Sequence, residues 1–275
     1  MHLYKFTMLG ETSIINLDSS LLWFSSLVAF NDPFEGKYNI RADYPNMEQS
    51  SALKIKEEFR QWYKTNGASE LDLKDFDRID SLQETVNSIF QFLKDMLSDA
   101  YEANNNRRGH CCFCQGDRKV LQNKLMWSHY SEGLRGFCLI FDENILMKSL
   151  RNENNLNELH KVPITYQEIL PEIDPIDELK KLTKGTDPKL FNAIPTTKSK
   201  VWEYEDEVRL ISENQGLHKY SSDALIEIVI GNKMEEPRQS LLKSIIKAKY
   251  PTVKVSYIDL RENEYKLEIS EGVTL

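Results

Sequence analysis

Hydrophobic positions recur along the chain with two different periods, which predicts a mixture of strands and helices. Residues 3–7 alternate between apolar and polar side chains, as a strand with one buried face requires. The nearly unbroken apolar run at 136–141 is typical of a strand buried on both faces. Alternation or short apolar runs predict further strands at 20–28, 110–114, 162–166, 201–211, 226–230, 253–258 and 265–267.

Helical spacing dominates residues 47–105, where Phe59, Trp62 and Tyr63 fall on one helical face. We therefore expect a helical insert at 47–105, with shorter helices near 121–127, 177–193 and 237–248. Strands and helices are mixed without strict βαβ alternation, so the predicted fold class is α+β. The prediction is a single domain over residues 1–275, with a mixed or antiparallel sheet as its core.

Composition and charge narrow the classes of protein. Lys and Arg number 35 against 43 Asp and Glu, and this net charge of −8 disfavours a broad nucleic-acid-coating surface. It leaves room for a local basic pocket. No run approaches the roughly 18 apolar residues of a membrane-spanning helix, and the N-terminus lacks a signal-peptide pattern. The four cysteines suit no disulfide framework, since three crowd into residues 111–114. The sequence predicts a soluble, cytoplasmic protein without membrane partners.

Two glutamates and an arginine stand out in the predicted strand 201–211. Alternate side chains of a strand share a face, so Glu205, Glu207 and Arg209 are expected to face one cleft. Two neighbouring carboxylates suit acid–base work or the stabilisation of a developing cation, and the arginine could hold an anionic group. A solvated strand face with a cross-strand salt bridge is the alternative.

A second group lies in Trp127, His129 and Tyr130. Trp127 and Tyr130 are three residues apart and can share a helix face, so the group could clamp a planar ring. The alternative is core packing by both aromatic residues, with His129 at the end of the helix.

Other polar residues give weaker signals. Asp32 and Glu35, in a tight Asn-Asp-Pro-Phe-Glu loop, could hold a cation or simply shape a turn. Lys5 is either an edge-strand charge or a ligand contact. The cysteines at 112 and 114 and the preceding His110 share a strand face but lack the second Cys pair of a structural zinc site, so no metal is predicted. Phosphate-loop, nucleophile-elbow and zincin motifs are absent from the sequence.

Four blocks occur together and in order, and as a set they resemble the bacterial domain-of-unknown-function family DUF2971. The blocks are Leu3-Tyr4-Lys5-Phe6; Leu22-Trp23-Phe24-Ser25 with Phe30-Asn31-Asp32-Pro33-Phe34-Glu35; Leu125-Met126-Trp127-Ser128-His129-Tyr130 before Gly136-Phe137-Cys138; and Trp202-x-Tyr204-Glu205-x-Glu207-x-Arg209.

The order of these blocks is similar to the ADP-ribosyltransferase superfamily, which implies a sheet core of that type and NAD as substrate. The resemblance implies that Glu207 is catalytic and that Glu205 assists at the acceptor. Implied cofactor contacts are Lys5, Ser25, Trp127, His129, Tyr130 and Arg209, with Ser25 orienting the nicotinamide ribose and Tyr130 stacking on the nicotinamide. Lys5 departs from the His or Arg usual at its position. The implied activity is mono-ADP-ribosyl transfer to an unknown protein or nucleic-acid acceptor, or NAD glycohydrolysis, in a bacterial toxin or phage-defence effector.

Two other functions remain open at this stage. A metal-dependent nuclease of a defence system would use Asp32, Glu35, Glu205 and Glu207, with Lys200 or Arg209 near the phosphate. A non-catalytic interaction or immunity protein would instead use the helical range 47–105 as its docking face.

Overall fold

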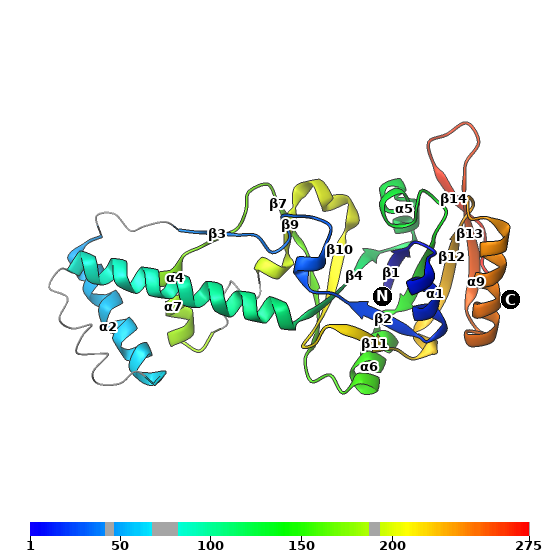
Figure 1. Ribbon diagram of the computed structural model, residues 1–275. Coiled ribbons are helices and arrows are strands. Elements are labelled where there is room, and N and C mark those ends of the chain that lie inside the picture. Colours follow the sequence, from blue (N-terminus) through cyan, green and yellow to red (C-terminus); the bar gives the residue numbers. More distant parts are fainter. Residues whose placement is uncertain (42–46, 68–81, 187–192, 275) are drawn as a thin grey trace. The chain divides into compact units, whose positions relative to one another are not determined.

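The computed structural model describes residues 1–41, 47–67, 82–186 and 193–274. The chain divides into two compact units (Figure 1). Unit 1 comprises Met1–Ala29, Arg107–Tyr166 and Lys200–Leu275; unit 2 comprises Phe30–Asn106 and Gln167–Ser199. Helices and strands are mixed along the chain and the main sheet is itself mixed, so the predicted α+β class is confirmed.

Unit 1 is built on a nine-stranded sheet with the order β14-β13-β12-β5-β1-β4-β10-β6, in which β15 also pairs with β13. Only the β12–β13 pair is parallel within this sheet. β5 lies inside the sheet, and the burial of all of residues 137–141 explains its unbroken apolar run. The strands are β1 (His2–Thr7), β4 (Gly109–Gly116), β5 (Phe137–Asp142), β6 (Leu159–Pro163), β10 (Glu207–Ser212), β12 (Leu225–Gly231), β13 (Lys254–Leu260), β14 (Leu267–Ile269) and β15 (Val273–Thr274).

Both faces of this sheet carry buried apolar side chains. Leu3 and Phe113 belong to a core cluster that includes residues of α1 (Glu11–Asp18), α6 (Glu143–Asn154) and α9 (Glu236–Lys249). Tyr4 and Cys114 belong to a second cluster, which includes residues of η2 (Arg118–Gln122) and α5 (Lys124–Tyr130). The register pairs Tyr4 with Cys114 and Cys114 with Glu207, so these three side chains share the face that packs against α5.

Short elements complete unit 1. A second, two-stranded sheet pairs β2 (Leu21–Phe24) with β11 (Gly216–Lys219). Ser25 then bridges to His110 of β4, which ties the end of β2 to an inner strand of the main sheet. The remaining short elements are η1 (Leu27–Ala29), η4 (Lys200–Glu205) and η5 (Ser222–Ala224), with the first two residues of β7 (Thr165–Gln167).

Unit 2 is mainly helical. Its helices α2 (Gln49–Thr65), α4 (Leu82–Arg107) and α7 (Pro175–Thr183) lie beside one another (Figure 1) and share a core of Ile55, Phe59, Ile89, Leu93, Ile176 and Leu179. Within 47–105, the described residues form only helices and connecting segments. Unit 2 also contains the parallel pair β3 (Asn39–Ile40) and β8 (Glu172–Ile173), together with η3 (Ile194–Thr196) and β9 (Thr197–Ser199).

The predicted strand 201–211 is wrong in its first half. Residues Lys200–Glu205 form the 3-10 helix η4, and β10 begins only at Glu207. Between them Asp206 has a φ of 43°, a left-handed conformation that Asp tolerates better than most residues and that no regular strand contains. Face alternation therefore holds for Glu207 and Arg209 but does not extend to Glu205.

Other differences are local. Helices α1 and α6 were not predicted from the sequence; α1 buries only Leu17, so its apolar periodicity is weak. The predicted strand 20–28 is shorter, because β2 ends at Phe24. Helix α7 covers the first part of the predicted helix 177–193, of which residues 187–192 lie outside the described residues. Among the described residues, none of the helices combines the length and apolar character needed to cross a bilayer.

Candidate functional site

A buried ion pair lies at the start of β10. The Arg209 Nε donates to Glu207 Oε1 at 2.6 Å, and the two side chains are 0% and 4% exposed, respectively. The Glu207 backbone N–H donates to the Tyr166 hydroxyl at 2.8 Å, which fixes the first residue of the strand. A carboxylate held in this way keeps its charge away from water, where that charge acts more strongly on its neighbours.

The second carboxylate is held from a different element. Tyr130 is the last residue of α5, and its hydroxyl donates to Glu205 Oε1 at 2.5 Å. The two residues are 75 positions apart in the chain. Glu205 is itself buried, at the end of η4. Helix α5 is placed by its N-cap Asn123, whose side chain accepts from the backbone of α5 and donates to the Tyr204 carbonyl at 2.6 Å.

Tyr130 and three other aromatic residues of α5 and η4 form a group of neighbouring rings. His129 Nδ1 lies 2.8 Å from the Tyr204 hydroxyl. The His129 ring lies 6.2 Å from Trp202 and 6.4 Å from Tyr130, and the Trp202 and Tyr204 rings are 6.0 Å apart. His129 is exposed, while the other three rings are half-buried. We call the seven residues His129, Tyr130, Trp202, Tyr204, Glu205, Glu207 and Arg209 the carboxylate–aromatic cluster.

The charges of this cluster act on the thiols of β4. Burial raises the pKa of the Cys114 thiol, and the carboxylates of Glu205 and Glu207 raise it further. Burial and Glu207 also raise the pKa of Cys112 well above its usual range, against the opposing effect of Arg209. Both thiols therefore stay protonated at neutral pH and are poor nucleophiles or metal ligands.

His110 has the opposite shift. Burial and the positive charge of Arg209 lower the pKa of His110 to about 4, below its ordinary value of 6.5. The folded protein then binds fewer protons than the unfolded chain between these two values. The contribution of neutral His110 to stability is complete above pH 6.5 and is lost as the pH falls towards 4.

The wild-type protein loses free energy of unfolding when the pH falls from 7 to 4. We expect this loss to be smaller in His110→Asn by about 3 kcal/mol. Asparagine keeps a polar group near the Ser25 carbonyl but does not titrate. Urea unfolding of both proteins at several pH values measures this difference. His160→Asn, an exposed position on β6, serves as the control. Equal acid sensitivity of the wild type and His110→Asn would contradict the prediction.

The structure brings together only part of the predicted site. Lys5 pairs with Leu139 and lies over the Phe113 ring, on the face opposite to Glu207; its Nζ donates to the Cys112 carbonyl at 3.1 Å. Trp127 is 1% exposed and donates to the Leu121 carbonyl, so its ring belongs to the core.

Ser25 bridges His110 on the same face as Glu207 but towards the other end of β4. Asp32 and Glu35 belong to unit 2. Within the described ranges, no group of three or more His, Cys, Asp or Glu side chains is arranged to hold a metal ion.

Sequence reasoning missed four members or supports of the cluster. Trp202 and Tyr204 were noted only in a family block, Asn123 was not singled out, and Tyr166 was placed only in a short strand. An Asn immediately before a helical segment is an N-cap signal that could have identified Asn123. No local pattern indicates that the Tyr166 hydroxyl accepts from the backbone of β10.

Comparisons with known proteins bear on one segment. The family described as Protein of unknown function (DUF2971) matches residues 126–210, which run from α5 into β10 and include the whole carboxylate–aromatic cluster. Neither a curated protein nor a solved structure matches the chain. Over residues 126–210 the chain is therefore similar to DUF2971, as its sequence blocks predicted.

Proposed function

We propose that this protein is an NAD-consuming enzyme of the ADP-ribosyltransferase type, with a fold related to that superfamily. One observation carries the proposal: two buried carboxylates, Glu205 bonded to Tyr130 and Glu207 paired with Arg209, both act on Cys114, and Tyr130 belongs to a group of aromatic rings. Loss of nicotinamide leaves positive charge on the ribose, and fixed negative charge stabilises it most effectively where water is excluded.

Each residue of the cluster has a role in this proposal. Glu207, oriented by Arg209, provides the negative charge that opposes the developing positive charge on the ribose. Glu205, bonded to Tyr130, accepts a proton from the attacking group. The Trp202 and Tyr204 rings offer apolar surfaces against which a flat nicotinamide ring can stack.

The proposal differs from the roles implied by family resemblance. Lys5 lies on the opposite face of the sheet from Glu207, so we assign it no NAD contact. Trp127 packs in the core and is likewise omitted. His129 and Arg209 remain cofactor-side residues, and Ser25 remains a candidate ribose contact. The reduced thiols support a cytoplasmic setting, in which the enzyme would act on a macromolecular acceptor as a bacterial toxin or phage-defence effector.

Incubation of the purified protein with NAD labelled in its adenosine part tests the proposal. We expect nicotinamide release, with label transferred to an acceptor added as bacterial lysate, or appearing as ADP-ribose if water is the acceptor. Chromatography separates the two products. Absence of nicotinamide release under all conditions would overturn the proposal, and magnesium-dependent cleavage of nucleic acid without NAD turnover would favour a nuclease instead.

A further inference from the structure

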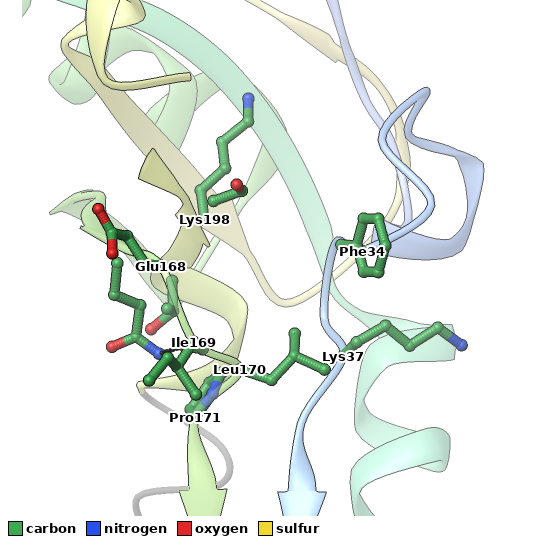
Figure 2. A pocket seen from close by; sticks show the side chains of 10 residues that line it. Phe34, Lys37, Glu168, Ile169, Leu170, Pro171 and Lys198 are labelled. Carbon is green, nitrogen blue, oxygen red and sulfur yellow. Dashed lines mark hydrogen bonds between the residues drawn. The ribbon is translucent and has the colours of Figure 1, made fainter. Parts of the chain in front are cut away.

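Unit 2 contains a hollow of about 170 Å³, whereas the carboxylate–aromatic cluster belongs to unit 1. This volume is below the roughly 300–1,000 Å³ of pockets for drug-sized ligands, so the hollow suits a smaller molecule. Figure 2 shows Phe34 and Lys198 on either side of the hollow, with Leu170 below them in that view. Its lining residues come from three stretches of unit 2: Phe34 and Lys37, residues 167–171, and β9.

One wall is an aromatic ring presented by a fixed turn. The Asp32 side chain accepts from the Phe34 backbone N–H at 2.9 Å, and the Asp32 carbonyl accepts from the Glu35 N–H at 3.1 Å. The Tyr101 hydroxyl of α4 donates to the Gly36 carbonyl at 3.0 Å and ties the turn to the helix. Although the turn is anchored at both points, the Phe34 ring is 61% exposed, so its apolar surface remains available to a ligand.

The opposite wall carries a buried cation. Lys198 is only 8% exposed, and its Nζ lies 3.6 Å from Glu35 Oε1, whose side chain is 1% exposed. Burying a charge is costly unless it is paired, and Glu35 provides a carboxylate partner here. An ammonium has three N–H donors, so Lys198 can contact a protein carboxylate and a ligand anion together.

Two lysines contribute to the lining. Lys37 and Lys198 line the hollow with a single acidic residue, Glu168, while the whole chain carries a net charge of −8. Lys37 is exposed and has no carboxylate partner among the described residues. Exposed Ile169, half-buried Leu170 and buried Pro171 provide apolar contact. The surface thus combines apolar walls with lysine side chains.

We propose that this hollow binds a small organic anion, with its aromatic or aliphatic body against Phe34 and Leu170 and its carboxylate or phosphate at Lys198. The turn Asn31–Glu35 then has two functions: Phe34 forms a wall of the site, and Glu35 positions Lys198. This binding site does not depend on NAD chemistry in unit 1.

Saturation-transfer NMR with the full-length protein tests the proposal. The probes are benzoate and phenyl phosphate, which combine a ring with an anion; benzyl alcohol supplies the ring alone, and inorganic phosphate the anion alone. We expect the two combined probes to bind at millimolar concentrations and each partial probe to bind about tenfold more weakly or not at all. Comparing the affinities of benzoate and phenyl phosphate shows whether the site prefers a carboxylate or a phosphate.

Variants locate the binding. Phe34→Ala and Lys37→Gln change exposed side chains, and each is expected to weaken binding of the better probe severalfold. Phe92→Ala and Lys54→Gln make the same exchanges at exposed positions of α4 and α2, away from the hollow, and should leave affinity unchanged. The double variant Glu35→Gln with Lys198→Met removes the buried pair without leaving a lone charge and is expected to abolish binding of the anion.

Two results would overturn the proposal. The first is the absence of saturation transfer to both combined probes with folded wild-type protein. The second is unchanged affinity in both Phe34→Ala and the double variant, because binding would then occur elsewhere. Circular dichroism and melting temperature establish that each variant is folded before its affinity is measured.

Discussion

Glu207→Gln is expected to slow nicotinamide release from NAD about 10²–10³-fold, the usual loss for one preorganised electrostatic contact. Glutamine keeps the shape of the side chain and removes the negative charge that would oppose the developing positive charge on the ribose. NAD should still bind, because the Trp202 and Tyr204 rings are unchanged. Single-turnover assays of nicotinamide release, together with NAD titration, measure the two effects separately.

A matched control is needed because Glu207→Gln also removes an anion that the buried Arg209 contacts. Glu227→Gln removes another buried carboxylate of unit 1, one bonded to Arg118 through both oxygens at 2.5 and 2.6 Å. Both variants should lose stability, and only Glu207→Gln should lose activity when both are assayed below their melting temperatures. A wild-type rate for Glu207→Gln, or an equal loss of rate in Glu227→Gln, would argue against a catalytic Glu207.

Arg209→Met is expected to lower the free energy of unfolding by about 3–5 kcal/mol, because it leaves the carboxylate of Glu207 buried without its cation. Arg209 is fully buried, so the lost contact cannot be replaced by water without opening the sheet. Urea unfolding at neutral pH measures the change. This prediction concerns stability alone and holds whether or not the cluster is catalytic.

A double-mutant cycle separates the energy of the ion pair from the effect of changing the size of each side chain. The loss of unfolding free energy in the double variant Glu207→Gln with Arg209→Met should be smaller than the sum of the losses in the two single variants, because the double variant removes both charges of the pair. Arg118→Met is the comparison, and it should cost less because the Arg118 side chain is 48% exposed. Strict additivity of the two single variants would show that the ion pair contributes nothing specific.

The strands and helices of unit 1 could be predicted where the hydrophobic pattern was strong. β1 and α9 lie where alternation and helical spacing placed them, because burial of one face imposes these periods; β5 and β12 lie where apolar runs placed them, because both of their faces are buried. α1 was missed because only one of its residues is buried. The strand 201–211 was extended too far because alternation of polar and apolar residues also occurs in the 3-10 helix η4.

The residues of the candidate site were likewise predicted only in part. Glu207 and Arg209 were correctly assigned to one strand face, since two positions two residues apart in β10 must share it. Glu205 was grouped with them by the same rule and belongs instead to η4. Its contact with Tyr130 depends on α5 being packed beside η4, which no spacing in the sequence encodes.

The sequence by itself determined the α+β class, the positions of most strands and the residue types that could carry chemistry. These follow from periodicities over a few residues, where the alternation of buried and exposed positions is a local consequence of backbone geometry. Only the tertiary structure decided that Lys5 and Glu207 occupy opposite faces and that Tyr130 bonds Glu205 across 75 positions of the chain. Strand order and helix packing fix these relations, because they depend on which distant apolar surfaces are buried against each other.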